Sequence, residues 1–184
     1  MRKGYLLLCL LLAACVTAVA GEPKTSIQVR GLGWGIFPTP IVLHDGDYWG
    51  GEIYLTLNGQ ELLKGVWSGQ DGESSWDGPD EMYGSGRNGI YTYAFNPLGD
   101  GTYKDTFTVH IALATFPIPN GAMGFGTYGG IHKIVSGTGR FKHAKGWLQV
   151  TGPWFDSGTA GATDFYARFA PEYCGYIDGV APAN

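Results

Sequence analysis

The stretch from Gly129 to Gly152 reads GGIHKIVSGTGRFKHAKGWLQVTG, two runs rich in apolar and β-branched residues joined by a short glycine-containing segment. Gly137 and Gly139 flank Thr138 at the centre of that segment. Glycine adopts φ > 0 without the steric cost that a Cβ imposes, and a tight connection between antiparallel strands needs such a residue. The stretch therefore predicts two strands joined at a hairpin-like corner, with Gly137, Thr138 and Gly139 as the structural turn.

Alternating apolar and polar residues continue on both sides of this stretch, which is the period of a half-buried strand. Asn58-Gly59 supplies the φ > 0 pair of a type I′ turn inside the clearest hairpin. The long polar segment 69–86 is predicted to be an acidic loop. The hairpin of two strands is expected at residues 52–67, and single strands are expected at 26–30, 41–43, 88–96, 102–115, 123–135, 145–151 and 163–169.

This pattern favours one all-β architecture. Residues 102–115 alternate over a length that is natural for a tilted barrel strand and long for a sandwich strand. About eight strands and no segment of helical period favour a closed antiparallel up-and-down β-barrel over an open sheet with exposed edges. The 31 glycines and the low content of charged residues (15%) agree with many short strands and turns.

The turn also resembles a known family signature. The pattern G-T-G-[RI]-F-x-x-A-x-G of the allene oxide cyclase and dirigent barrels is matched between Gly137 and Gly146, with a departure at Ser136, where dirigent proteins usually carry glycine. The resemblance implies an eight-stranded, calycin-like barrel that is usually a trimer. It also implies that a reactive intermediate is shaped in the lumen, by a cyclase-like, isomerase-like or dirigent-type activity. The acidic and arginine positions of dirigent proteins do not align here, so no catalytic residue is carried over.

The N-terminus predicts export. Residues 1–20 have a basic start, an apolar run and a small-residue exit, as a secretory signal does, which leaves 21–184 as a single barrel domain. Leu12-Ala13-Ala14-Cys15 resembles a bacterial lipobox, in which Cys15 would carry the lipid. Both routes stay open, and the protein is expected to be secreted, periplasmic or held at the cell surface. A membrane contact is expected only through such a lipid anchor.

Charge and metal-ligand patterns exclude several function classes. Without Arg2 and Lys3 the chain carries ten basic and sixteen acidic residues, a net charge of −6, and no basic stripe that would favour nucleic acid. The four histidines lack metal-ligand spacing, and Cys174 is the single cysteine after the leader. We therefore expect no metal, no cofactor and no intramolecular disulfide.

The function hypotheses depend on the lumen, because an eight-stranded barrel is either filled by side chains or holds one small ligand. The candidate ligand-binding residues are aromatic or polar side chains on the predicted strands and corners: Trp34, Trp67, Tyr91, Tyr93, His110 and Trp147. The first hypothesis is an exported barrel that binds a small hydrophobic or phenolic molecule and steers its cyclisation or coupling. The alternative is a non-catalytic carrier, lipocalin-like in its Gly-Trp-rich corner at 31–35, or a surface interaction protein.

Overall fold

The computed structural model describes residues 26–77, 83–117, 126–157 and 166–183. The predicted signal and the lipobox cysteine, Cys15, lie outside the described residues. The described strands are β1 (Ile27–Phe37), β2 (Trp49–Leu57), β3 (Glu61–Gln70), β4 (Glu73–Asp77), β5 (Tyr83–Arg87), β6 (Ile90–Pro97), β7 (Tyr103–Pro117), β8 (Gly126–Thr138), β9 (Lys145–Ser157), β10 (Tyr166–Phe169) and β11 (Glu172–Asp178), with one 3₁₀ turn, η2 (Gly139–Phe141). No described helix has the length and hydropathy that a membrane crossing requires.

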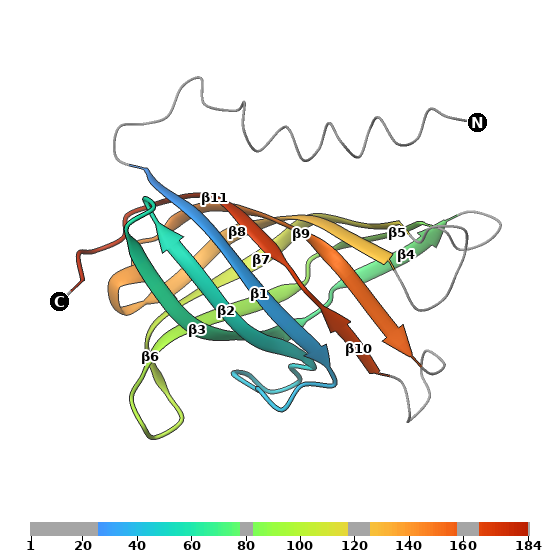
Figure 1. Cartoon of the computed structure of the whole chain (residues 1–184), viewed down its shortest axis with the longest axis horizontal. Helices are drawn as coiled ribbons and strands as arrows, with labels where there is room; N and C mark the ends of the chain where they lie inside the picture. The colour runs from blue at the N-terminus through green and yellow to red at the C-terminus, as the bar shows by residue number, and fades with distance from the viewer. Residues whose placement is uncertain (1–25, 78–82, 118–125, 158–165, 184) are drawn as a thin grey trace.

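The strands close into a ring. Neighbours pair antiparallel in the order β1, β2, β3, β6, β7, β8, β9 and β11, and β11 pairs back with β1 (Figure 1). This confirms the predicted eight-stranded antiparallel barrel. Closure of the ring removes the exposed backbone edges that an open sheet would leave.

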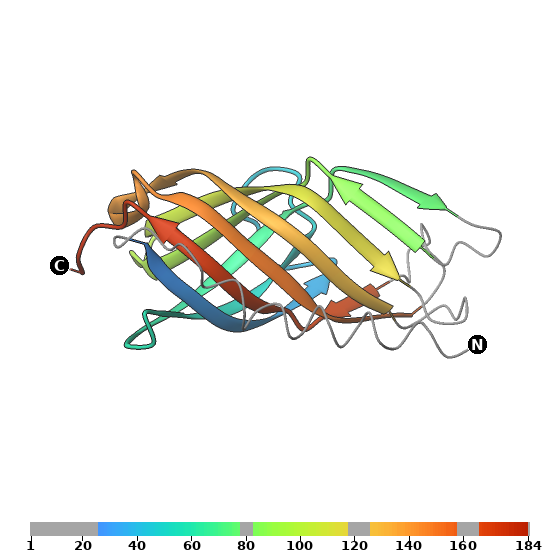
Figure 2. The same ribbon diagram turned by 90° about the horizontal axis from the view of Figure 1, so that it is seen from above.

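Three of the eight positions in the ring are each shared by two successive strands: β3 with β4, β5 with β6, and β10 with β11. β3 pairs with β6, and β4 pairs with β5. Both β5 and β6 pair with β7, and both β10 and β11 pair with β9 and β1. The prediction of a loop at 69–86 is therefore wrong in part. This region contains the paired strands β4 and β5, and their hairpin extends beyond one end of the barrel (Figure 2). Of the expected last strand at 163–169, residues 166–169 form β10 and residues 163–165 lie outside the described ranges. An additional strand, β11, follows it, and residues 41–43 form no strand.

Aromatic side chains fill much of the ring. The buried core is continuous across all eight strand positions and includes Trp67, Tyr91, Tyr93, Phe95, Phe107, Phe141 and Tyr173. Glycines on neighbouring strands leave room for the rings: a Cβ on Gly35 would lie 2.3 Å from the Trp67 ring, and one on Gly65 2.5 Å from the Phe95 ring. Interiors are packed nearly as densely as organic crystals, so large rings require such gaps beside them. The high glycine content is in part a packing requirement of this core.

One end of the barrel is closed by η2. Gly139 has φ +54°, as the predicted turn requires, and the chain then makes a 3₁₀ turn before β9 instead of a tight hairpin. Phe141 from η2 is fully buried among Phe95 and Phe107, with ring centroids 5.8 and 5.2 Å away. The matched signature thus has a structural role in this chain, because it places an aromatic plug over the base of the core.

Candidate functional site

A buried polar group crosses the lumen at the level of His132 on β8. Its Nε2 lies 2.7 Å from the Tyr128 hydroxyl and its Nδ1 lies 3.1 Å from the Tyr93 hydroxyl. His132 is 4% exposed, and burial lowers the pKa of its imidazole to about 3, so the ring is neutral near pH 7.

The tautomer of His132 sets the direction of these two hydrogen bonds. A neutral imidazole has one N–H donor and one acceptor nitrogen, so one of the two tyrosine hydroxyls donates to the ring and the other accepts from it. Tyr173 packs edge-on against Tyr93, with ring centroids 5.9 Å apart, and burial raises the pKa of both phenols above its ordinary value. We call Tyr173, Tyr93, His132 and Tyr128 the lumenal relay.

A carboxylate lies next to this relay, where β3 gives way to β4. Asp71 Oδ2 accepts a 2.9 Å hydrogen bond from Nε1 of Trp49, and Oδ1 accepts one from the Tyr91 hydroxyl. The Asp71 amide donates to the Tyr48 hydroxyl at 2.8 Å. Tyr91 stacks on His132 with ring centroids 5.8 Å apart. We call Tyr48, Trp49, Asp71 and Tyr91 the mouth cluster.

Asp71 is an exposed residue, but the pKa of its carboxyl group is raised. The residue as a whole is exposed, yet its carboxylate oxygens lie between Trp49 and Tyr91. Loss of solvation raises the pKa of Asp71, and this exceeds the opposite effect of the hydrogen bonds from Tyr91 and Trp49. Asp71 is therefore an exposed residue whose carboxylate is held by two hydrogen-bond donors and is poorly solvated.

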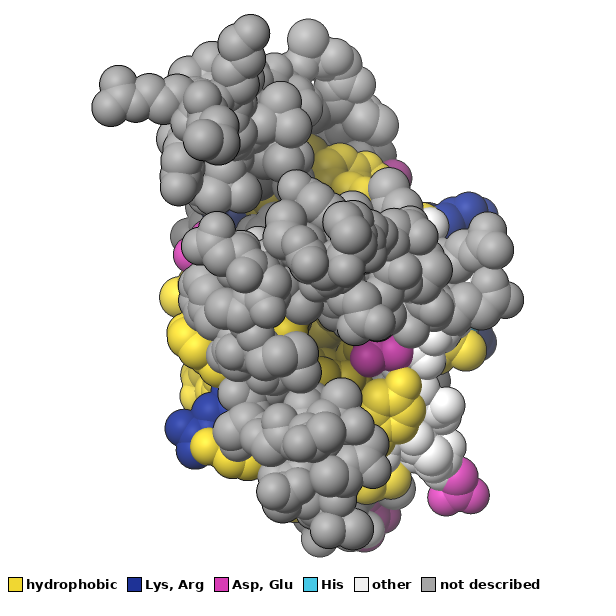
Figure 3. All heavy atoms as spheres, turned by 90° about the vertical axis from the view of Figure 1, so that its right-hand side faces the viewer, with side chains coloured by type: hydrophobic (Ala, Val, Ile, Leu, Met, Phe, Trp, Pro, Cys, Tyr) yellow, Lys and Arg dark blue, Asp and Glu magenta, His cyan; other side chains and the backbone are white. Residues whose placement is uncertain are grey.

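Local sequence explains why these groups meet. The alternation of β6 sends Tyr91 and Tyr93 inward, and the break at Asp71-Gly72 ends β3 beside Tyr91. On β8, Gly130 leaves space for Tyr128, because a Cβ on Gly130 would lie 2.4 Å from the Tyr128 hydroxyl oxygen. Figure 3 views the molecule from the end beyond which β4 and β5 extend, where hydrophobic side chains of the described residues, with a few acidic ones, are visible between the parts drawn in grey.

The structure separates the six predicted ligand-binding residues into two groups. Trp67, Tyr91 and Tyr93 are buried in the ring, 3%, 8% and 1% exposed. Trp34, Trp147 and His110 lie on the outer surface, exposed to solvent, and are not brought together with the lumenal residues. Ligand contact by any of the six remains a prediction.

Sequence reasoning missed six residues of the site: Tyr48, Trp49, Asp71, Tyr128, His132 and Tyr173. A signal for His132 was present, because it shares its strand face with Ile134, which is buried, while Ile131, Lys133 and Val135 on the other face are exposed. Because the outer face also carries the apolar residues Ile131 and Val135, hydrophobicity alone does not show which face of the strand is buried.

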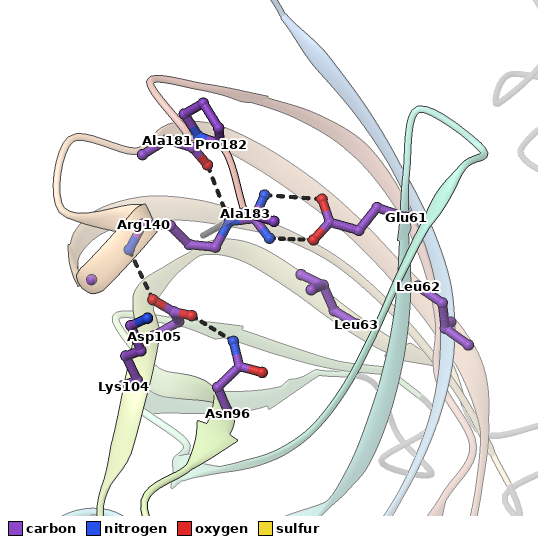
Figure 4. A pocket seen from close by; sticks show the side chains of 11 residues that line it. Glu61, Leu62, Leu63, Asn96, Lys104, Asp105, Arg140, Ala181, Pro182 and Ala183 are labelled. Carbon is purple, nitrogen blue, oxygen red and sulfur yellow. Dashed lines mark hydrogen bonds and ion pairs between the residues drawn. The ribbon is translucent and has the colours of Figure 1, made fainter.

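A cavity of about 370 Å³ lies at the closed end, around Arg140 (Figure 4). The guanidinium binds both carboxylate oxygens of Glu61, and its Nε donates to the Ala181 carbonyl at 3.1 Å. Asp105, 3% exposed, accepts from the Arg140 amide at 2.9 Å and from Asn96 at 2.5 Å. Arg140 is thus paired with Glu61, and the Asp105 carboxylate is held by two neutral N–H donors. We therefore interpret this cavity as a structural part of the closed end, where β3, β7, η2 and the C-terminal segment meet.

In the described ranges, no three His, Cys, Asp or Glu side chains lie close enough together to hold a metal ion. Cys174 on β11 is half-buried, and its Sγ lies 3.9 Å from Oε1 of Gln149.

Ring closure and the site together define a closed antiparallel β-barrel whose aromatic core carries one polar layer and an accessible carboxylate. No family model matches the chain, and no curated protein matches it. Among solved structures it is similar to a pterocarpan synthase dirigent protein, with 14% identity over 87% of this chain and 94% of that one and a TM-score of 0.39. That TM-score is too low to support an argument about function, and the fold assignment depends on the strand pairing.

Proposed function

We propose that the barrel binds a small hydrophobic or phenolic molecule at the mouth cluster. The observation that carries this proposal is Asp71, an exposed residue whose carboxylate is held against the aromatic residues Trp49 and Tyr91. Ligand sites are mostly apolar and contain a few polar groups that fix orientation. A phenol has the same two parts, a flat apolar ring and one hydroxyl donor.

The geometry limits where such a ligand binds. The barrel is filled from Phe141 at the base up to Trp67 and Tyr91, so the guest lies beyond Tyr91, toward the end that carries β4 and β5. Each oxygen of Asp71 accepts one described hydrogen bond, and a carboxylate has about four acceptor sites in all. A guest hydroxyl therefore has an acceptor at Asp71 without displacing Trp49 or Tyr91.

Steering of cyclisation or coupling is the catalytic form of this proposal. It needs a guest held in one orientation and one group that exchanges a proton with it. Asp71 supplies that group, because its raised pKa makes it a stronger proton acceptor than an ordinary aspartate. A non-catalytic carrier uses the same site and releases its guest unchanged, so product analysis separates the two forms.

Binding is tested by titrating the protein with 1-naphthol, a phenolic probe, and with naphthalene, which has the same rings without the hydroxyl. We expect tighter binding of 1-naphthol, and we expect Asp71→Asn to weaken it about tenfold or more through the loss of a charge-assisted hydrogen bond. The control variant is His110→Ala, because His110 lies on the outer surface. Absence of 1-naphthol binding, or equal affinities in the two variants, would contradict the proposal.

Export, lipidation and assembly are further proposals, supported by the sequence at residues 1–20 and by the family resemblance. We propose that the protein is exported, with a lipid on Cys15 or with release after the signal, and that it forms a homotrimer. Native mass spectrometry of protein from its own source tests these together. It reports the mass of the processed N-terminus, any acyl group, the number of subunits and any co-purifying small molecule.

A further inference from the structure

The pairing of Tyr91 with Asp71 has a consequence that ligand binding does not use. The Tyr91 phenol is 8% exposed and donates its proton to Asp71 Oδ1. A tyrosine loses an electron far more readily when a base at hydrogen-bond distance takes the proton in the same event, because the protonated phenoxyl cation is a very strong acid. Tyr91 has such a base within one proton transfer.

We propose that Tyr91 is a redox-active tyrosine whose oxidation transfers its proton to Asp71. A one-electron oxidant of the peroxyl or phenoxyl radical class takes one electron from Tyr91 and is reduced to its anion. The O–H bond of Tyr91 breaks, its proton forms an O–H bond on Asp71, and the products are a neutral tyrosyl radical and a carboxylic acid. The reverse step returns the electron and the proton. This inference goes beyond the proposed ligand binding and does not require it.

The proton acceptors in the barrel decide which tyrosine takes this role. Tyr93 and Tyr128 also have a hydrogen-bonded base, His132, but burial lowers the pKa of that imidazole to about 3, so it accepts a proton poorly. Loss of solvation acts in the opposite direction on Asp71 and raises its pKa. Tyr91 therefore has the better acceptor of the two.

The aromatic neighbours of Tyr91 provide a route for the electron. The Trp67 ring lies 5.5 Å from the Tyr91 ring between centroids, and the Trp67 indole donates a 3.2 Å hydrogen bond to the Trp34 carbonyl. The side chain of Trp34 is 42% exposed on the outer surface. Tryptophan is itself oxidisable, so an oxidant that reacts outside the barrel can draw its electron from Tyr91 through Trp67.

Burial distinguishes Tyr91 from tyrosines on the outer face of the barrel. Tyr54 also donates to a carboxylate, Glu52, at 2.8 Å, but this pair lies on the outer face, and hydrogen bonds from Tyr54 and Trp34 lower the pKa of Glu52. A radical on an accessible phenol is removed by coupling with another molecule, whereas the Tyr91 ring is 8% exposed and packs against Trp67 and His132, which limits its contact with a phenol from solution. A radical on Tyr91 is therefore expected to be long-lived.

The test oxidises the full-length protein with photogenerated tris(bipyridine)ruthenium(III) and follows the tyrosyl radical by transient absorption and electron paramagnetic resonance. We expect a long-lived radical in the wild type that Tyr91→Phe abolishes and that the matched control, Tyr54→Phe, leaves unchanged. Asp71→Asn should slow its formation about tenfold or more, since it removes the charged acceptor. Radical formation should also slow as the pH falls through the pKa of Asp71.

Two results would overturn the inference: a long-lived radical that persists in folded Tyr91→Phe, or a rate that is the same in Asp71→Asn and in the wild type. Wild-type protein in heavy water gives a measurement that no variant can disturb by misfolding. Radical formation must be slower there than in ordinary water, and equal rates would show that proton transfer to Asp71 is not coupled to oxidation.

Discussion

Gly139→Ala tests how the base of the barrel is built. Gly139 has φ +54°, and a Cβ there would lie 2.1 Å from Oδ1 of Asp105 and 2.4 Å from the Lys104 carbonyl oxygen. Alanine therefore meets two separate costs, the left-handed backbone and the displacement of a buried carboxylate that Arg140 and Asn96 hold.

Each cost has a magnitude. The left-handed conformation costs a residue with a Cβ roughly 1–2 kcal/mol. Displacing Asp105 weakens hydrogen bonds to a charged group, which contribute about 1.5–3 kcal/mol each. Gly59→Ala isolates the first cost, since Gly59 has φ +68° and a Cβ added there would meet no atom within 4 Å. The gap in unfolding free energy between the two variants should be about 2–3 kcal/mol, equivalent to roughly 4–12 °C in Tm for a domain of this size.

The assay is urea and thermal unfolding of both variants beside the wild type, followed by tryptophan fluorescence and circular dichroism. Any effect of alanine on the unfolded chain is shared by the two variants and cancels in the comparison. Equal destabilisation by Gly139→Ala and Gly59→Ala would refute the reasoning, because it would show that the contact with Asp105 costs nothing.

Three further predictions concern stability. His132 has a folded-state pKa of about 3, below its value of 6.5 in the unfolded chain, so its contribution is complete above pH 6.5 and is lost as the pH falls toward 3. Urea unfolding measured from pH 7 to pH 5 should show a slope that steepens toward about 1.4 kcal/mol per pH unit, and His132→Phe should lack it. Phe141→Ala should cost about 3–5 kcal/mol in unfolding free energy, as a fully buried ring leaves a cavity, and a loss below 1 kcal/mol would contradict its role as a plug. Glu61→Gln should cost about 1 kcal/mol, and less at high salt, because its ion pair with Arg140 is partly exposed; a salt-independent loss would argue against an ionic contribution.

Much of the fold could be predicted from local sequence, because alternation and turn chemistry are local properties. Phe107, Val109 and Ile111 share one face of β7 and are all buried, and Asn58 and Gly59 have the positive φ values that their turn requires. The same reasoning missed β11, where Tyr173 and Ile177 face inward with Gly175 between them. A glycine in that position gives no hydrophobic signal, so the inward row cannot be recognised without its partner strands.

The site was harder to predict than the fold, because it depends on register between strands. Tyr91 and Tyr93 were found from alternation, but their partners Asp71 and His132 come from the end of β3 and from β8. β8 is not adjacent to β6 in the ring, so only the pairing of each with β7 places His132 opposite Tyr93. One buried histidine on one strand has no local mark of function, which is why the exposed His110 was predicted instead.

The pairing of bulky rings with facing glycines gives the interior an asymmetric response to mutation. Shortening one ring, as in Trp67→Leu, enlarges the enclosed space in a single step, since Gly35 across from it stays as it is. Placing a larger residue at Gly35 needs two coordinated changes, because the Trp67 ring must first be replaced by a smaller side chain. Accumulated single substitutions therefore tend to widen this barrel, so its capacity can grow gradually without a change in backbone.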